Sequence, residues 1–192
     1  MNYRHEYHAG NFADVFKHLM LITLIKAQLR KKKSFCYLDT HAGRGLYDLS
    51  SETAKKTGDA EHGIVRLLQN LITYPKISEH PIPEVVKTYL QIIENFQYPP
   101  FYPGSPLIAQ SMMREEDRLI LMELHPEEFK ILKQNLSGDQ RVACHHQDGY
   151  QGLAAFLPPK ERRGLILIDP PFEKENEWVY RPTYPGGVSK MA

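Results

Sequence analysis

Few of the 192 residues belong to the types that mark special classes of protein. There are only two cysteines, Cys36 and Cys144, and both fall in apolar runs, which excludes a disulfide scaffold and favours reduced thiols in a cytoplasmic protein. No apolar run approaches the ~18 residues of a membrane span, and no secretory signal is visible. The formal net charge is only +1, so any nucleic-acid binding would need a local basic patch. The whole sequence is 42% hydrophobic and 24% charged, a composition typical of one globular domain with an ordinary core.

The most informative stretch is GLILIDPPF, from Gly164 to Phe172. Its apolar half predicts a strand buried on both faces, as at the centre of a parallel sheet. Two prolines cannot continue such a strand, so the chain must leave the sheet directly after Asp169. A carboxylate, a rigid turn and an aromatic ring then stand at the edge where open α/β sheets bind their ligands.

A glycine-containing turn follows the first predicted strand. The strand covers Ser34 to Asp39, and the turn continues as Thr-His-Ala-Gly-Arg-Gly to Gly45, with His41 near its start. Small residues at such a junction let the backbone approach a ligand closely, although a turn of this kind is often no more than a turn. The spacing is not G-x-G-x-x-G, so the turn favours a nucleoside-type cofactor without a pyrophosphate over a dinucleotide.

Acidic residues also end the next two predicted strands. Glu123 closes the strand Arg118–Leu124, where nucleoside-binding α/β folds hold the ribose hydroxyls. Asp148 follows the weaker strand Arg141–His146, where it could accept from an adenine amino group. With Asp169 and the acid that ends the first strand, they predict one acidic rim. S-adenosylmethionine, which carries an adenosine, a sulfonium charge and an amino acid, would suit that rim.

The segment before the first strand predicts a helix from Asn11 to Leu29 with Asn11 as its N-cap. Asp14 and His18 share one face of this helix. A solvated arm followed by an ordinary amphipathic helix accounts for the same pattern. His5 and His8 form an H-x-x-H pair without evident further ligands, so we expect no metal site.

Residues 46–101 interrupt the alternation of strands and helices. Apolar spacing predicts helices over Gly63–Ile72 and Glu84–Phe96, and we expect a helical subdomain over one end of the sheet. Gly-Ser-Pro then opens another helix, with Ser105 as the expected N-cap. The alternative for Ser105 is a position beside the ribose or carboxylate of a cofactor.

The tetrapeptide Asp169 to Phe172 indicates the reaction. It is of the [DNS]-P-P-[YFW] type used by enzymes that methylate amino or amide nitrogens. The lone pair of adenine N6 is delocalised into the ring, and a carboxylate and the Pro170 carbonyl accepting its two N–H groups would free it for attack. A base stacked on Phe172 would gain roughly 1–3 kcal/mol. The motif does not specify which nitrogen is methylated.

At this point the sequence resembles a known family, the RlmJ-type 23S ribosomal RNA adenine-N6 methyltransferases. The resemblance implies a Rossmann-like class I methyltransferase α/β sheet with helices on both faces and a helical insertion after the first strand. It also implies S-adenosylmethionine as cofactor, protein-free 23S ribosomal RNA as substrate, no membrane association and a monomer. The matching segments span residues 3–173 and are YRHEYHAGNFADVFKH, YLDTHAGRGLYDL, YPGSPLIA, ELHP, QDGYQGL and RRGLILIDPPFE.

The resemblance further implies roles for single residues. Asp169 is the expected catalytic acceptor, with Pro170 and Phe172 completing its motif. Tyr3 is the expected substrate contact, and Arg4 and Lys17 lie in the same matched segment. The expected cofactor contacts are His18, His41, Ser105, Glu123, Asp148 and Gly149.

The resemblance ends after Glu173, where the family continues with further strands and this sequence does not. We therefore expect a methyltransferase domain of residues 1–45 and 102–173 that is incomplete at its C-terminus through truncation or a frame shift. Residues 46–101 would be the inserted subdomain and 174–192 a divergent tail, which leaves strand 164–168 as a bare edge. The alternatives are an adenine-N6 methyltransferase of DNA, an N-methyltransferase of proteins or small molecules, and a non-catalytic RNA-binding remnant. The remnant would use Arg4, His5, Lys17 and the basic run 30–33.

Overall fold

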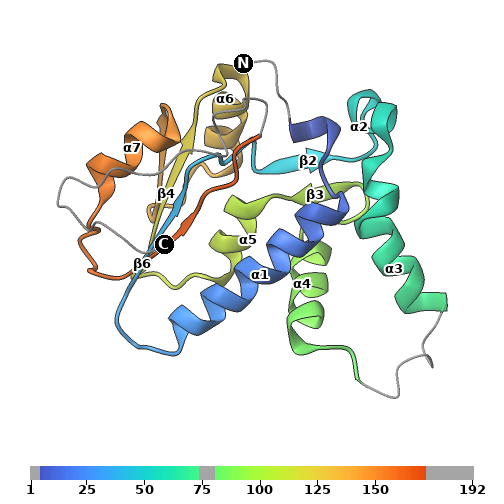
Figure 1. The fold of residues 1–192 in the computed structure, drawn as a ribbon, viewed down its shortest axis with the longest axis horizontal. Coiled ribbons are helices and arrows are strands. Elements are labelled where there is room, and N and C mark those ends of the chain that lie inside the picture. The colour runs from blue at the N-terminus through green and yellow to red at the C-terminus, as the bar shows by residue number, and fades with distance from the viewer. Residues whose placement is uncertain (1–4, 74–80, 172–192) are drawn as a thin grey trace, which may run out of the picture.

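The computed structural model describes residues 5–73 and 81–171 (Figure 1). Tyr3, Arg4, Phe172 and the predicted tail 174–192 lie outside the described residues. The elements in chain order are η1 (His5–Tyr7), α1 (Phe12–Leu29), β1 (Cys36–Asp39), β2 (Leu46–Asp48), α2 (Glu52–Thr57), η2 (Asp59–His62), α3 (Ile64–Thr73), α4 (Glu84–Asn95), β3 (Phe101–Pro103), α5 (Ser105–Met112), β4 (Arg118–Glu123), α6 (Pro126–Asn135), β5 (Val142–His146), α7 (Gly149–Phe156) and β6 (Gly164–Leu167).

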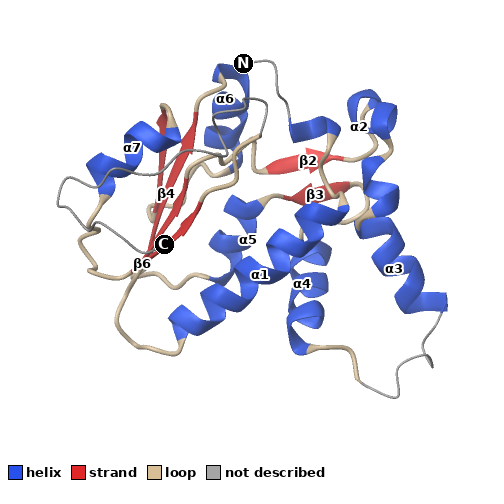
Figure 2. Ribbon diagram, viewed as in Figure 1, coloured by secondary structure: helices blue, strands red, loops and turns tan. Residues whose placement is uncertain are grey.

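A parallel sheet in the order β5-β4-β1-β6 forms the centre of the described fold. Asp39 at the end of β1 pairs in register with Leu121 of β4 and Leu167 of β6. The carboxyl ends of these strands therefore meet at one edge, as the sequence predicts. Figure 2 shows a second, separate ribbon, in which β2 and β3 pair antiparallel.

Successive side chains of a strand point to opposite sides, so the apolar strands of this sheet present apolar residues on both faces. Helices cover both faces. On one face, Tyr37 and Leu119 pack with Ile22 of α1, Ile108 of α5 and Leu132 of α6. A smaller cluster on the other face is centred on Leu38 and Ile120, with Leu153 of α7 packed against them. These two layers confirm the predicted Rossmann-like α/β fold with helices on both faces.

Strand β6 is less buried than its sequence predicts. We expected it at the centre of the sheet, but within residues 5–73 and 81–171 it pairs only with β1 and forms the outer strand. Its residues Leu165 to Leu167 are half-buried, and Ile168 is 46% exposed. A continuous apolar run thus predicts the strand but not its place, which depends on the neighbours that pair with it. The alternative expectation, a bare edge, fits the described residues.

Helix α1 begins as predicted, with Asn11 as N-cap and its Oδ1 accepting from the Asp14 N–H at 2.9 Å. It is not an ordinary amphipathic helix. Asp14 and His18 are almost fully buried, whereas large apolar side chains at Phe12 and Phe16 are more than half exposed. No described helix is both long and apolar enough to cross a membrane.

The stretch from β2 to β3, residues 46–103, contains the two predicted helices, here α3 and α4, and two features that the sequence did not predict. One is α2, a polar helix defined by its caps: Ser51 accepts from the Ala54 N–H, and Gly58 ends the helix with φ +64°. The other is the β2–β3 ribbon, whose strands are too short to show a period. The division into a domain of 1–45 and 102–173 with an insertion at 46–101 stays a prediction.

Candidate functional site

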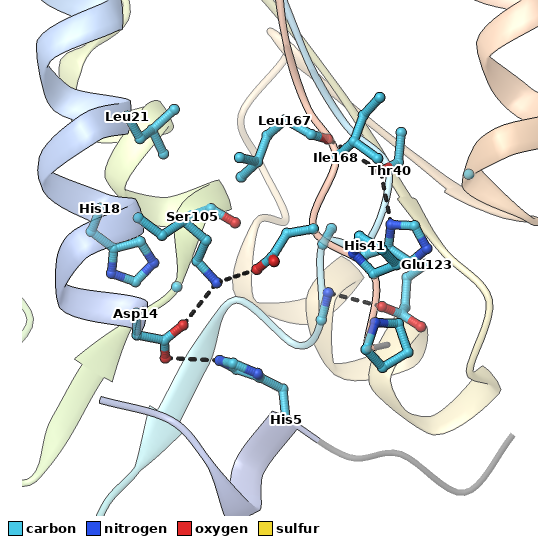
Figure 3. A pocket seen from close by; sticks show the side chains of 18 of the residues that line it. His5, Asp14, His18, Leu21, Thr40, His41, Ser105, Glu123, Leu167 and Ile168 are labelled. Atoms are coloured by element: carbon cyan, nitrogen blue, oxygen red, sulfur yellow. Dashed lines mark hydrogen bonds and ion pairs between the residues drawn. The ribbon is translucent and has the colours of Figure 1, made fainter. Parts of the chain in front are cut away.

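A cavity of 660 Å³ lies between α1 and the carboxyl ends of the sheet strands (Figure 3). This volume is within the usual range for a small-molecule site, about 300–1,000 Å³. Every described residue of the predicted site lines it, namely Lys17, His18, His41, Ser105, Glu123, Asp148, Gly149, Asp169 and Pro170. The structure thus brings together residues from six separate segments, although their individual roles stay predictions.

The glycine turn after β1 forms part of the cavity wall. Gly43 has φ +61°, and a Cβ atom there would collide with the Tyr47 hydroxyl, so only glycine fits. Its N–H donates to Glu123 Oε2 at 2.8 Å. Arg44 makes two hydrogen bonds to the Glu128 carboxylate, at 2.8 and 2.6 Å, which ties the turn to α6. The turn is therefore held rigid from both sides.

Glu123 is positioned by two backbone groups. One carboxylate oxygen accepts from Gly43 and the other from the His125 N–H at 2.7 Å. Burial raises the pKa of Glu123 above its ordinary value, and these two bonds oppose that shift. Each carboxylate oxygen has a second lone pair, so Glu123 retains acceptor capacity toward the cavity. The ribose contact predicted for it fits this arrangement.

Ser105 is not the helix cap that we expected. Gly104 occupies the N-cap position of α5, and the Ser105 hydroxyl donates instead to Asp39 Oδ2 at 2.7 Å. Asp39 is fully buried and also accepts from the Tyr37 hydroxyl at 2.8 Å. Its burial raises the pKa of the carboxyl. Asp39 therefore supports the cavity wall from behind and is not among the residues that line it.

Asp148 and Gly149 form the rim opposite α1. The Asp148 side chain accepts from the Gln151 N–H at 3.0 Å and so caps α7. Gly149 approaches β1 so closely that a Cβ atom would collide with the Thr40 carbonyl. His41 lies across from Tyr150, edge to face, with ring centroids 5.3 Å apart. The close approach explains why a glycine is needed directly after the acid.

His18 presents a buried polar atom that no described residue satisfies. Its Nδ1 lies 3.0 Å from the Tyr102 hydroxyl, which in turn lies 2.9 Å from that of Tyr89. Its Nε2 is buried without a hydrogen-bond partner among the described residues. Burial lowers the pKa of His18 to about 3, so the ring is neutral at physiological pH. A buried orphan atom in the wall of a cavity is what a bound ligand would satisfy.

Asp169 lies directly beyond β6 and is paired with Lys17. Lys17 Nζ is 2.7 Å from Asp169 Oδ2, and also 2.7 Å from Oδ1 of the buried Asp14. Asp169 Oδ1 accepts from none of the described residues. Sequence reasoning grouped Lys17 with the substrate contacts, and the structure places it against the predicted catalytic carboxylate.

The N-terminal arm is anchored over the site, at least from His5 onward, and is not a solvated segment. His5 Nε2 lies 2.8 Å from Asp14 Oδ2, Glu6 pairs with Arg44 at 3.0 Å, and His8 pairs with Asp59 at 2.8 Å. Sequence reasoning missed these contacts, because His5 and His8 suggested only a weak metal motif. In the described part of the chain, no three His, Cys, Asp or Glu side chains are grouped to hold a metal ion.

The donor set fits S-adenosylmethionine on chemical grounds. His18 with its unsatisfied Nε2, the acceptors Glu123 and Asp148, and the glycine turn all line one cavity. Leu165 and Met20 add apolar surface to the same cavity, as a site for a nucleoside would need.

Comparison with known proteins agrees with this geometry. The family of ribosomal RNA large subunit methyltransferase D, RlmJ, matches residues 32–181. "Ribosomal RNA large subunit methyltransferase J" of Haemophilus influenzae is 42% identical over 182 residues, which is 93% of this chain and 62% of that protein. The protein of the same name from Escherichia coli K12 is 42% identical over 181 residues, 93% of this chain and 61% of its own length.

A crystal structure of a Legionella pneumophila protein superposes with a TM-score of 0.78 at 38% identity, over 90% of this chain and 61% of that one. The chain thus spans less than two thirds of the length of these relatives. The family match nevertheless covers most of the chain, including β1, the acidic rim and the Asp-Pro-Pro segment. The chain belongs to the RsmJ family of ribosomal RNA large subunit methyltransferases, RlmJ.

Proposed function

We propose that this chain transfers a methyl group from S-adenosylmethionine to the exocyclic N6 nitrogen of an adenine in 23S ribosomal RNA. The observation that carries the proposal is Asp169-Pro170 directly after β6, on the wall of the same cavity as His18 and Glu123. The names of the two curated relatives support a large-subunit ribosomal RNA as the substrate.

S-adenosylmethionine, when bound, supplies an electrophilic methyl group on a positively charged sulfur. Glu123 would hold the ribose hydroxyls and Asp148 the adenine amino group of this cofactor. His18, with its unsatisfied Nε2, would contact the cofactor together with His41. The two further proposed cofactor contacts are Ser105 and Gly149.

Asp169 would act on the substrate base. One N–H of the adenine amino group would donate to the Asp169 carboxylate and the other to the Pro170 carbonyl, which frees the nitrogen lone pair for attack. Lys17 takes only Oδ2, so Oδ1 is available as the acceptor within the described structure. The Asp169 carboxylate would also receive the proton that the amino group loses on methylation. Phe172, Tyr3 and Arg4 are proposed to contact the substrate.

The test is methylation of protein-free 23S ribosomal RNA with a labelled donor, followed by mapping of the labelled nucleotide. Asp169→Ala should lower turnover by about 10²–10⁴-fold and largely spare cofactor binding measured by calorimetry. Glu123→Ala should instead weaken cofactor binding first. Wild-type turnover in Asp169→Ala would refute the mechanism.

Two further arms separate the alternatives. Matched RNA and DNA oligomers carrying the mapped sequence distinguish an RNA from a DNA substrate, which the Asp-Pro-Pro segment cannot do. A chain that binds RNA but produces no heat with S-adenosylmethionine would be a binding module and not an enzyme. Label in RNA but not in DNA is the result that we expect.

A further inference from the structure

The carboxylate of Asp14 joins three separate parts of the N-terminal region. Its Oδ2 lies 2.8 Å from His5 Nε2 and accepts from the Gly10 N–H at 2.9 Å, while its Oδ1 lies 2.7 Å from Lys17 Nζ. Figure 3 shows the contact between His5 and Asp14 beside His18. The side chain is 3% exposed, so all of these contacts are shielded from water. These three contacts together restrict the Asp14 carboxylate to a single orientation.

Charge pairing outweighs the penalty of burying this carboxylate. Burial alone would raise the pKa of Asp14, but the neighbouring His5 and Lys17 hold it well below its ordinary value. Asp14 is therefore a carboxylate at physiological pH, and it can pair with a cation. In a helix that needed only to pack, an apolar residue here would avoid the desolvation penalty.

Lys17 links the buried Asp14 carboxylate to Asp169, the first residue of the Asp-Pro-Pro segment. Its Nζ lies 2.7 Å from both Asp14 Oδ1 and Asp169 Oδ2, and its side chain is only 18% exposed. Burial opposes the charge, but the two carboxylates raise the pKa of Lys17 above its ordinary value. A free lysine side chain has about 2 kcal/mol of rotamer entropy, and Asp14 restricts that freedom before a substrate arrives.

We propose that Asp14 is a positioning residue for methyl transfer: held by His5 and Gly10, it fixes the Lys17 ammonium, which in turn fixes the Asp169 carboxylate at the cavity wall. The inference rests on the proposed function, because it assigns Asp169 to the reaction. Asp14 itself acts only through Lys17 and touches no substrate.

The first test compares Asp14→Asn with Asp59→Asn. Asp59 is a matched control because it also pairs with an N-terminal histidine, His8, at 2.8 Å, but does not line the cavity. Asp14→Asn should lower kcat by about 10²-fold, since displacing a reacting group by ~1 Å costs that much. KM for RNA and the Kd for S-adenosylmethionine should change little. Asp59→Asn should leave kcat unchanged.

The second test follows the titration of Lys17, which a merely structural role for Asp14 would not link to turnover. The titratable groups that interact with Lys17 are Asp14 and His18 of α1, Asp39 at the end of β1, and Asp169 beyond β6, while His5 of η1 pairs with Asp14. Removing the Asp14 charge leaves burial to disfavour the ammonium, so the pKa of Lys17 should fall. The alkaline limb of the kcat profile should then move to lower pH in Asp14→Asn, in parallel with the side-chain amine signal in NMR.

Wild-type kcat in Asp14→Asn, or an equal loss in Asp59→Asn, would overturn the proposal. If Asp14→Asn does not fold, Asp14→Glu replaces it, because glutamate keeps the charge but moves it by one methylene. A folded Asp14→Glu variant with reduced kcat supports the positioning role. Wild-type kcat in that variant contradicts it. If the wild-type chain transfers no methyl group, the proposed function fails. The NMR titration then still decides whether Asp14 fixes the Lys17 ammonium, since an unchanged pKa of Lys17 in Asp14→Asn excludes it.

Discussion

The two faces of helix α1 show opposite relations between polarity and burial. On the face toward the cavity, Asp14 and His18 are 2% and 1% exposed. Along a neighbouring stripe, Phe12, Phe16 and Met20 recur at every fourth position and are 71%, 58% and 47% exposed, with Leu24 one turn further. Phe16, Met20 and Leu24 also line the cavity, from its open side. A helix that served only to cover the sheet would bury its apolar residues and expose its polar ones.

Both stripes border the cavity, but only the polar one is linked to the Asp169 carboxylate, through Lys17. Burying a carboxylate is costly unless partners satisfy it, and Asp14 has three such partners. The apolar side chains of this stripe gain no stabilisation from contact with water. Their exposed surface is not covered by residues 5–73 or 81–171. Stability and function in α1 therefore depend on the polar face and on the core residues beside it, such as Ile22. Three predictions test this comparison.

The largest effect should come from the polar face. Asp14→Ala leaves the buried Lys17 ammonium with one partner fewer, and removing one member of a buried pair costs about 3–5 kcal/mol of unfolding free energy. Urea denaturation of the chain without cofactor measures this loss. Asp59→Ala, which breaks the more exposed pair with His8, should cost only about 0–1 kcal/mol. Equal losses in the two variants would contradict the special position of Asp14.

The second effect concerns pH. His18 has a pKa of about 3 in the folded chain against an ordinary value of 6.5, so between these values the unfolded chain binds a proton that the folded chain does not. The stability contributed by neutral His18 is therefore complete above 6.5 and falls with decreasing pH, by up to about 1.4 kcal/mol per pH unit. Below 3.8 the protonation of Asp14 would add a further loss of stability, because its pKa is lowered as well.

His18→Gln should flatten this dependence, because glutamine does not titrate. Urea denaturation at pH 7 and at about pH 4.5 measures the difference, in a window above the titration of Asp14. The lowered pKa of His145 acts in the same direction in both proteins, so comparing wild type with His18→Gln isolates His18. An identical pH dependence in the two chains would show that His18 is not buried in its neutral form.

The smallest effect should come from the apolar stripe. Phe16→Ser should change the unfolding free energy by no more than about 0.5 kcal/mol, as expected for an exposed position. Ile22→Ala, on the buried face of the same helix, should cost about 2–5 kcal/mol. Comparable losses would mean that the stripe is covered in solution.

Much of the site could be predicted from local patterns. The glycine turn, Glu123 and Asp169 each follow an apolar strand, and parallel strands bring such ends to one edge. The apolar run of β6 does not by itself distinguish a buried central strand from a half-buried edge strand, and the pairing within the described residues shows that β6 is the outer strand. The role of Ser105 was also mispredicted, since the Gly-Ser-Pro pattern suits a cap equally well and its real partner, Asp39, lies 66 residues away.

The amino-acid sequence was sufficient for the strands of the parallel sheet, the helices α1, α3 and α4, the N-cap of α1 and the acids at the strand ends, because these depend on neighbours within a few residues. Only the tertiary structure decided that Lys17 bridges Asp14 and Asp169, 152 residues from the second of them. Long-range ion pairs of this kind have no sequence period, since they form where folding brings separate segments together. The same holds for the buried, unsatisfied nitrogen of His18, which becomes visible only when its surroundings are known.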